Sequence, residues 1–483
     1  MGDLGLCDCP AWQLAEMLRL KEVSAREVMA AFLDRISQVN PLLNAIVTLD
    51  EEGARQSAAM ADQALASGRA AGPLHGLPIA IKDTHETKGM RTTFGSVLFA
   101  DYVPTRDAPH VRRLRQAGAI VVGKTNTPEF AAGSQTFNRV FGVTRNPYAL
   151  DRTPGGSSGG AAAAVASRML PLAEGSDLAS SIRNPASFCN LVGLRPSQWL
   201  LPPTVPEDAF LPLSVVGPLA RSCRDARLLL QAMSPRPRRP ATSPVPSRRR
   251  RRPVRIAWCA DADGLPVEPG VQDVLSAVVA VLAVNGWQIR EAAPYLAAAD
   301  EVFRVMRALY LAARFGELLR DHRSEIKETL AVNIDLGLRL TGDEVTNAYR
   351  ERGLIFARLQ DLLSSHDVLA LPTAQVAPFP ADQEWVASIA GVPQATYIDW
   401  LRSCSRVTVT AHPAVSIPAG FTQDGLPVGL QLVGRLGADY QLLDIAEEIE
   451  EFIGATRRAP SLRRSGETLA DLTGTASLKE TRP

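Results

Sequence analysis

The first 40 residues repeat hydrophobic side chains at helical spacing. Leu14 and Leu18 share one face, and the same spacing recurs at Val28 and Phe32. Residues three or four positions apart lie on the same side of a helix. This pattern therefore predicts two amphipathic helices between residues 11 and 39.

A different rhythm follows between residues 76 and 142. Apolar runs at residues 77–81 and 119–122 alternate with a helical stretch at 108–116. Runs that are apolar at nearly every position suit strands that are buried on both faces. The alternation of such strands with helices predicts a layered α/β architecture.

The second half of the chain continues this architecture. Residues 298–363 have a helical pattern rich in Arg, Leu and Ala, which suits a cover over the core. We predict one large α/β/α domain over residues 1–460, with a mixed central sheet covered by helices, and a loose tail at residues 461–483. Further strands are predicted at residues 254–259, 369–371 and 414–417, and further helices at 271–285 and 440–453.

Residues 234–253 form the clearest break in composition. They are dense in Pro and Arg, hold almost nothing to bury, and include five consecutive arginines at 248–252. This composition predicts a disordered surface loop. A nucleic-acid patch is the alternative for the arginines, but a solvated linker fits the surrounding prolines better.

The overall charge argues against a polyanionic partner. The 483 residues carry 52 Lys and Arg against 51 Asp and Glu, a net charge of +1. We therefore expect a small-molecule substrate, no nucleic acid and no membrane partner. We also expect the protein to be a monomer or a homodimer. Six scattered cysteines and the lack of a signal or spanning segment predict a cytoplasmic protein. No residue pattern implies a metal or an organic cofactor.

A loop rich in glycine and serine lies at residues 153–160, which read TPGGSSGG and lead into alanines. Small residues and hydroxyls at the start of a helix leave backbone N–H groups free for a ligand. A flexible linker or a phosphate cradle would share this composition. Two other blocks change the interpretation: GLPIAIKD at residues 76–83 and GSDLASSIRNPA at 175–186.

Together these three blocks resemble the amidase signature family, and residues 117–130 and 413–434 also look like family segments. The resemblance covers most of the chain. It implies the amidase signature fold and hydrolysis of a carbon–nitrogen acyl bond through a serine acyl-enzyme. It places Lys82 at the catalytic lysine of the family, Ser157 at the serine that follows a cis peptide bond, and Ser181 at the acylated serine.

The chemistry of these residue types agrees with that division of roles. A serine hydroxyl needs a base to become a good nucleophile, and Lys82 can be that base only when it is neutral. Burial among apolar neighbours such as Ile79 and Ile81 would lower its pKa enough. Ser157 would then relay the proton from Ser181 and later return it to the leaving amine. The histidines lie in no recognisable triad context and are expected to be structural or surface residues: His75, His85, His110, His322, His366 and His412.

The resemblance places the oxyanion hole at the backbone N–H groups of Leu178, Ala179, Ser180 and Ser181. The family usually has two glycines where this chain has Ala179 and Ser180. Side chains there would be strained in a left-handed turn and would reduce activity, whereas a negative φ would tolerate them. The Ile-Arg-Asn-Pro that follows sets the register and favours Ser181 over Ser180 as the nucleophile.

Three further residues are expected to support this turn. Asp177 and Arg183 carry opposite charges six positions apart, and we expect a buried pair that clamps the turn. Ser158 follows the relay serine, and we expect it to hydrogen-bond its loop in place or to cap a helix.

Three other functions compete with hydrolysis. Residues 118–125 match the phosphate-loop pattern G-x-x-x-x-G-K-T. Residues 119–122 within it read as a strand that follows a helix, whereas that loop should follow a strand and precede a helix. Alternatively, this chain could be a family member with impaired catalysis that acts as a binding protein. An amidase subunit of a glutamine amidotransferase acting on charged tRNA shares the same triad, although Asn190 and Arg195-Pro-Ser look more like a free-standing amidase.

The sequence constrains the identity of the substrate less than it constrains the fold or the site residues. A helical stretch over residues 302–340 offers Met306, Tyr310, Phe315 and Leu319, which suit apolar acyl or aryl groups but are also typical of ordinary core. The resemblance extends to urethane and arylamide hydrolases. Amides, anilides and carbamates are therefore the expected substrate classes.

Overall fold

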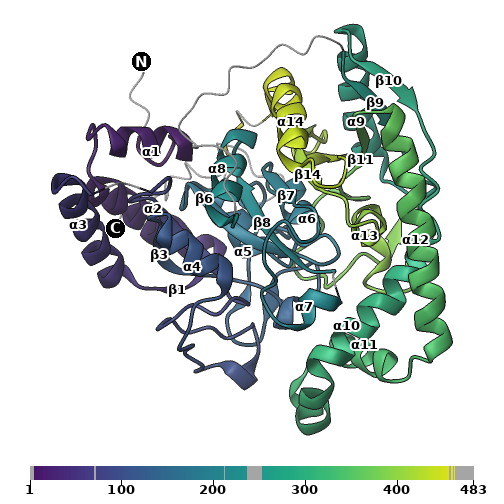
Figure 1. The fold of residues 1–483 in the computed structure, drawn as a ribbon, viewed down its shortest axis with the longest axis horizontal. Coiled ribbons are helices and arrows are strands. Elements are labelled where there is room, and N and C mark those ends of the chain that lie inside the picture. The colour runs from purple at the N-terminus through teal and green to yellow at the C-terminus, as the bar shows by residue number, and fades with distance from the viewer. Residues whose placement is uncertain are drawn as a thin grey trace, which may run out of the picture.

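The computed structural model describes residues 5–69, 72–211, 213–235, 253–455, 458–460 and 462. Nearly all of the predicted Pro- and Arg-rich loop, and nearly all of the predicted tail, lie outside the described residues. The described part is a mixed α/β structure in which helices surround a large twisted sheet (Figure 1). The predicted fold class is therefore confirmed.

Two helices open the chain, as the hydrophobic spacing predicts. They are α1 (Ala11–Arg19) and α2 (Ala25–Leu43), and their buried faces contribute Leu14, Val28 and Phe32 to the core. A capping box begins α2, because the Ser24 side chain accepts from the Glu27 backbone while Glu27 accepts from Ser24.

The main sheet has eight strands in the order β10-β9-β11-β15-β14-β7-β8-β6. β10, β9 and β11 run parallel to one another, and all other neighbours are antiparallel. The strands are β6 (Leu172–Asp177), β7 (Val192–Arg195), β8 (Val215–Ala220), β9 (Arg255–Trp258), β10 (Gln288–Glu291), β11 (Val368–Pro372), β14 (Ala414–Phe421) and β15 (Pro427–Val433). This mixed sheet confirms the predicted strands of the second half.

A smaller sheet of three strands lies beside it in the order β1-β3-β2. Its strands are β1 (Ile46–Leu49), β2 (Pro78–Lys82) and β3 (Ile120–Thr125), with β2 parallel to β3. Residues 120–125 of the apparent phosphate-loop motif form β3, and Lys124 is buried, donating from Nζ to the Thr92 hydroxyl at 2.7 Å. The motif is therefore a strand, as its composition predicts.

Two short helices carry the serine-rich blocks into the core. α5 (Gly159–Ala166) is buried along its whole length and packs on β6, and α6 (Arg183–Phe188) packs on β14 and β15. Glycine makes the close approach of α5 to β6 feasible. A Cβ added to Gly175 would lie 2.6 Å from the Ser158 hydroxyl, far inside van der Waals contact.

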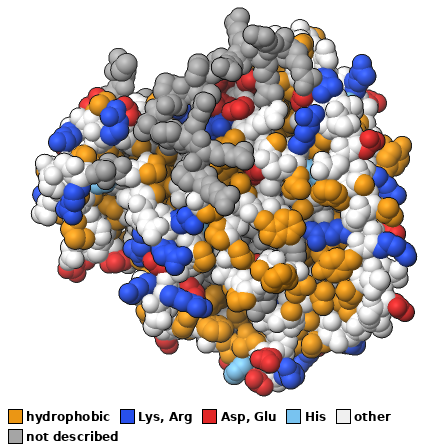
Figure 2. All heavy atoms as spheres, in the orientation of Figure 1, with side chains coloured by type: hydrophobic (Ala, Val, Ile, Leu, Met, Phe, Trp, Pro, Cys, Tyr) orange, Lys and Arg blue, Asp and Glu red, His pale blue; other side chains and the backbone are white. Residues whose placement is uncertain are grey.

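Two long helices, α10 (Ala299–His322) and α12 (Gly342–Ser365), and the shorter α11 (Glu328–Leu338) cover one side of the molecule (Figure 1). Hydrophobic side chains gather over α10 and α11 on the face that Figure 2 shows. No helix in the described ranges is long and apolar enough to cross a membrane. The remaining elements are α3 (Glu51–Ala66), α4 (Pro109–Gln116), α7 (Glu207–Phe210), α8 (Cys223–Met233), α9 (Pro269–Val284), α13 (Arg402–Val409), α14 (Asp439–Ile453), β4 (Phe137–Asn138), β5 (Gly142–Val143), β12 (Ser388–Ile389) and β13 (Val392–Pro393).

Candidate active site

A cavity of about 220 Å³ lies between the serine-rich blocks and helix α10. We call its two sides the floor and the helical wall. The floor comprises Lys82, Ser157, Ser158, Ser176 and Ser181, of which Ser157, Ser176 and Ser181 line the cavity directly. The helical wall comprises the cavity-lining residues of α10, namely Arg307, Tyr310, Leu311, Arg314 and Phe315.

Lys82 is the last residue of β2 and is completely buried. Its Nζ donates to the hydroxyls of Ser157 at 2.7 Å, Ser158 at 2.9 Å and Ser176 at 3.0 Å. The smaller sheet thus places the amine of Lys82 beside three hydroxyls. Two of them belong to the loop that leads into α5, and one belongs to β6.

Burial lowers the pKa of Lys82 to about 7, because the charged ammonium loses its hydration, while the carboxylates of Glu174 and Asp177 oppose this shift. An unperturbed lysine has a pKa of about 10.4. The neutral form of Lys82 is therefore accessible near pH 7. An amine in this state can accept a proton under mild conditions.

The glycine and serine loop brings Ser157 to Lys82. The peptide bond between Gly156 and Ser157 is cis. The next residue, Ser158, occupies the N-cap position of α5 but makes no capping hydrogen bond with its side chain. That side chain instead accepts from Lys82 and donates to the Ser176 carbonyl at 3.3 Å, so it ties the loop to β6.

The two adjacent serines after β6 have different surroundings. Ser181 lines the cavity, is 6% exposed, and its hydroxyl makes no hydrogen bond within the described part of the chain. Ser180 is 1% exposed, does not line the cavity, and its hydroxyl lies 3.3 Å from that of Ser134. Of the two, Ser181 therefore presents an unengaged hydroxyl to a bound molecule.

The turn from Leu178 to Ser181 offers a row of backbone donors. None of these four N–H groups donates a hydrogen bond to any residue that the structure describes. None of the four residues has a positive φ, so Ala179 and Ser180 cause no left-handed strain. The replacement of glycine in this turn is therefore accommodated by the backbone.

Asp177 and Arg183 form a fully buried pair beneath this turn. The guanidinium donates from Nε and Nη2 to the two carboxylate oxygens, both at 2.9 Å, and from Nη2 to the Ala179 carbonyl at 2.8 Å. Although burial alone would raise it, the pKa of Asp177 is held at about 2 by Arg183 and by Arg195. Asp177 also accepts from the Ile182 backbone, so the pair fixes the turn at both ends.

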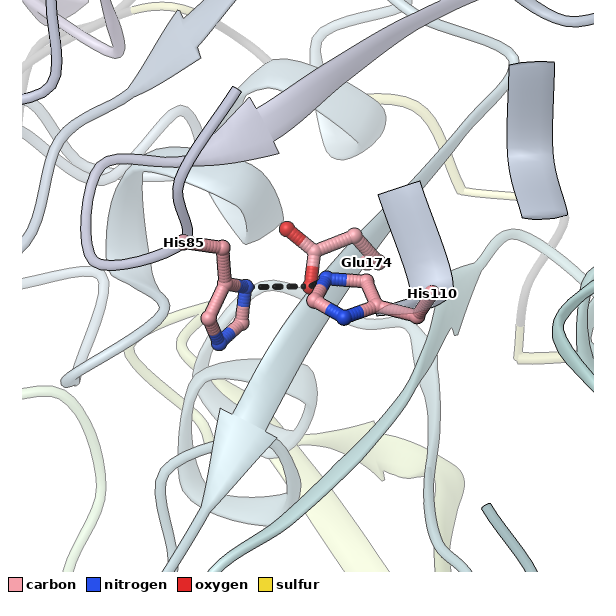
Figure 3. A group of neighbouring side chains, drawn as sticks. All are labelled: His85, His110 and Glu174. Atoms are coloured by element: carbon pink, nitrogen blue, oxygen red, sulfur yellow. Dashed lines mark ion pairs between the residues drawn. The ribbon is translucent and has the colours of Figure 1, made fainter. Parts of the chain in front are cut away.

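His85, His110 and Glu174 form a buried cluster (Figure 3), and His85 also lines the cavity. Glu174 accepts from the Lys82 backbone N–H at 2.6 Å and lies 2.9 Å from His85 Nδ1 and 3.5 Å from His110 Nε2. Burial lowers the pKa of His85 to about 4, so this ring is neutral near pH 7. Their ligand atoms lie within 4.8 Å of one another, and among the described residues these three are the group that could hold a metal ion.

Sequence reasoning did not identify two residues of this site, Glu174 and Ser176. They lie two positions apart on β6, so they share one face of that strand. The polar residues Glu174 and Ser176, at alternate positions of the strand, are the signal that could have identified them. Their partner, Lys82, lies 92 and 94 positions away, which no local pattern reveals.

Comparison with known proteins identifies the family. The family model described as Amidase matches residues 27–443. An acylamidase of Rhodococcus erythropolis is 35% identical, covering 91% of this chain and 94% of the relative. A glutamyl-tRNA(Gln) amidotransferase subunit of Moorella thermoacetica is 36% identical, covering 94% of this chain and 98% of that relative.

Solved structures agree with these relatives. A bacterial aryl acylamidase of the amidase signature family has a TM-score of 0.86 at 26% identity, covering 95% of this chain and 99% of the other. A 6-aminohexanoate cyclic dimer hydrolase has a TM-score of 0.83 at 27% identity, covering 95% of this chain and all of the other. The matched sequence, the shared fold and the conjunction of Lys82 with the two serine blocks lead to one conclusion: this chain belongs to the amidase signature family.

Proposed function

We propose that this chain hydrolyses an amide, anilide or carbamate through an acyl-enzyme on Ser181. The observation that carries the proposal is the contact of 2.7 Å between Lys82 Nζ and Ser157 Oγ, beside the free hydroxyl of Ser181. A lysine with a pKa of about 7 is a competent base near neutral pH. The three side chains together supply a base, a relay and a nucleophile.

In the proposed acylation step, the Ser181 hydroxyl attacks the carbonyl carbon and passes its proton to Ser157, which passes its own proton to Lys82. The carbonyl oxygen becomes an oxyanion and accepts hydrogen bonds from free N–H groups of the turn Leu178 to Ser181. When the C–N bond breaks, Ser157 protonates the leaving nitrogen and regains a proton from Lys82. The product is an ester on Ser181 and a free amine.

In the proposed deacylation step, water replaces the amine in the cavity. The same relay removes a proton from the water as it attacks the ester carbonyl. Collapse of the second tetrahedral intermediate breaks the bond to Ser181 Oγ, which takes back its proton through Ser157. The acid product leaves, and a carbamate cleaved at its C–N bond would release a carbonic acid monoester at this point.

The cavity favours substrates with an apolar part. Phe94, Phe130 and Phe315 line it, and the rings of Phe130 and Phe315 lie 4.9 Å apart. Aromatic walls of this kind bind aryl and alkyl groups by burying their surface. The acylamidase and aryl acylamidase among the similar proteins support an aryl or acyl amide as the substrate class.

A second candidate function follows from the amidotransferase subunits among the relatives, which are 32–36% identical to this chain in the matches to Alkaliphilus metalliredigens and Moorella thermoacetica. On this alternative, the same serine would release ammonia from glutamine for a partner. Glutaminase activity that appears only when partner subunits are added would favour it. We favour a free-standing enzyme that acts in the cytoplasm as a monomer or homodimer.

Labelling with a fluorophosphonate tests the nucleophile. Intact-protein mass spectrometry should show one adduct on the wild type and on Ser180→Ala, and none on Ser181→Ala. Ser180→Ala is the matched control, because it removes the neighbouring hydroxyl from the same turn. An adduct that persists in Ser181→Ala, or is absent from the wild type, would refute the proposal. Hydrolysis of 4-nitroanilides and of aryl carbamates would then define the substrate class.

A further inference from the structure

One cationic side chain of the helical wall has no anionic partner. Arg307 lines the cavity and is only 5% exposed. Its Nη1 donates to Asn333 Oδ1 at 2.5 Å, and its Nη2 donates to the hydroxyl of Tyr397. In the ranges that the structure describes, no carboxylate lies within ion-pair distance of it. The guanidinium is therefore held by neutral groups alone.

This arrangement is costly unless something compensates the charge. A guanidinium stays protonated in proteins, and a buried charge is normally paired. The cavity contains one carboxylate among its described lining residues, Glu86, which already accepts from Arg106 at 2.9 Å and from Tyr102 at 2.8 Å. The cavity itself therefore supplies no counter-charge for Arg307.

A neighbouring arginine shows the contrast. Arg314 lies two turns further along α10 and donates from Nη1 to the Tyr310 hydroxyl at 2.7 Å. That hydroxyl donates in turn to the Asp208 carboxylate at 2.8 Å. The network of Arg314 thus ends on a carboxylate of the chain, whereas the network of Arg307 ends on an amide and a phenol.

We propose that Arg307 and Tyr397 form an anion subsite that binds a carboxylate on the substrate. This inference rests on the proposed function and narrows it to amides that carry a carboxylate on an apolar body. Leu311, Ile398 and Leu401 line the cavity as well, so the body of the substrate meets apolar surface near the subsite. A carboxylate accepts two hydrogen bonds from one guanidinium and supplies the missing charge.

Matched pairs of substrates test this subsite. One pair has a carboxylate on the acyl side, glutaric acid mono-4-nitroanilide against pentanoic acid 4-nitroanilide. The other has it on the amine side, 4-acetamidobenzoate against acetanilide. We expect the wild type to prefer the carboxylated member of one pair. Arg307→Gln should lower kcat/KM for that member by about 10- to 100-fold, mainly through KM, and change the neutral member less than about twofold.

Arg304→Gln is the matched control, because Arg304 lies on the same helix, is partly exposed and pairs with Glu301 instead. Arg304→Gln should leave kcat/KM unchanged for both members of the substrate pair. If Arg307→Gln lowers kcat/KM equally for both members, Arg307 only stabilises the helical wall, and the proposal is overturned. Lack of any preference in the wild type for either pair would overturn it as well.

A binding measurement separates this proposal from the proposed function. In Ser181→Ala, benzoate should raise the Tm while benzamide does not, and the further change Arg307→Gln should abolish the rise. Benzoate stabilisation without hydrolysis of any amide would refute the proposed function and retain the subsite. Hydrolysis without benzoate stabilisation would retain the function and refute the subsite.

Discussion

The floor and the helical wall of the cavity differ in how completely their polar groups are engaged. On the floor, Lys82 has three hydroxyl partners, and the Asp177–Arg183 pair beneath it is bidentate. On the wall, Arg307 has no charged partner among the residues that the structure describes. A site that must perform the same proton transfers on every substrate needs fixed geometry. A site that selects its substrate can contain a charged group whose partner is supplied by the substrate.

Loss of the base should have the largest effect. Lys82→Met keeps a buried side chain of similar length but removes the amine that is the base in the proposed mechanism. We expect kcat/KM for a 4-nitroanilide to fall by about 10³- to 10⁴-fold, since residues of a catalytic triad act as a unit. Steady-state kinetics measures the change, and circular dichroism checks the fold. A folded variant with activity within tenfold of wild type would contradict the role of Lys82.

The pH profile is expected to follow the lysine. In the proposed mechanism Lys82 must be neutral to accept a proton, and its pKa is about 7. Below that value kcat/KM should fall tenfold per pH unit, and above it should level off. The pKa of His85 is about 4 and that of Asp177 about 2, so neither titrates in this range. A flat profile between pH 5.5 and 8, as an approximate working range, would contradict a lysine base.

Breaking the buried pair under the floor should destabilise the fold. Asp177→Asn leaves Arg183 charged and buried, which typically costs about 3–5 kcal/mol. Urea unfolding measures this as a lower midpoint. The control is Glu301→Gln, which breaks the partly exposed pair with Arg304 and should cost less than about 1 kcal/mol. Equal effects of the two substitutions would show that the floor is not specially dependent on its charge pair.

The smallest effect is expected on the wall. Phe315→Leu removes the contact with Phe130 and should raise KM for an aryl amide by about three- to tenfold, while KM for acetamide stays unchanged. Tyr349→Leu on α12 is an exposed aromatic control and should change neither value. A shift that is equal for both substrates would show that Phe315 does not contact the aryl group.

Much of the fold was predictable because its signals are local. The helical spacing of Leu14 and Val28 and the apolar run at residues 77–81 each determine an element within a few residues. Lys82, Ser157 and Ser181 were named as site residues through a family resemblance carried by short blocks, and their roles stay a prediction. Whether Ala179 strains its turn depends on the backbone angles, so only the structure could answer it.

The remaining features depend on distant partners. Glu174 meets the Lys82 backbone across 92 positions, and Arg307 meets Tyr397 across 90. For Met306, Tyr310, Phe315 and Leu319 of α10, the sequence left two roles open, pocket lining and ordinary core. Tyr310 and Phe315 line the cavity, whereas Met306 and Leu319 lie in the packed clusters behind it. Periodicity identifies the helix but does not determine which of its faces borders a void.

The three hydroxyls around Lys82 limit how hydrogen bonds can be arranged in each protonation state of the amine. An ammonium has three hydrogens, so it can donate to Ser157, Ser158 and Ser176 at once. A neutral amine has two hydrogens and a lone pair, so one hydroxyl must turn and donate to it. The hydrogen of Ser158 is directed to the Ser176 carbonyl. Deprotonation of Lys82 therefore requires the hydroxyl of Ser157 or of Ser176 to turn and donate to the amine. When Ser157 turns, its proton already points to Lys82 before any substrate arrives.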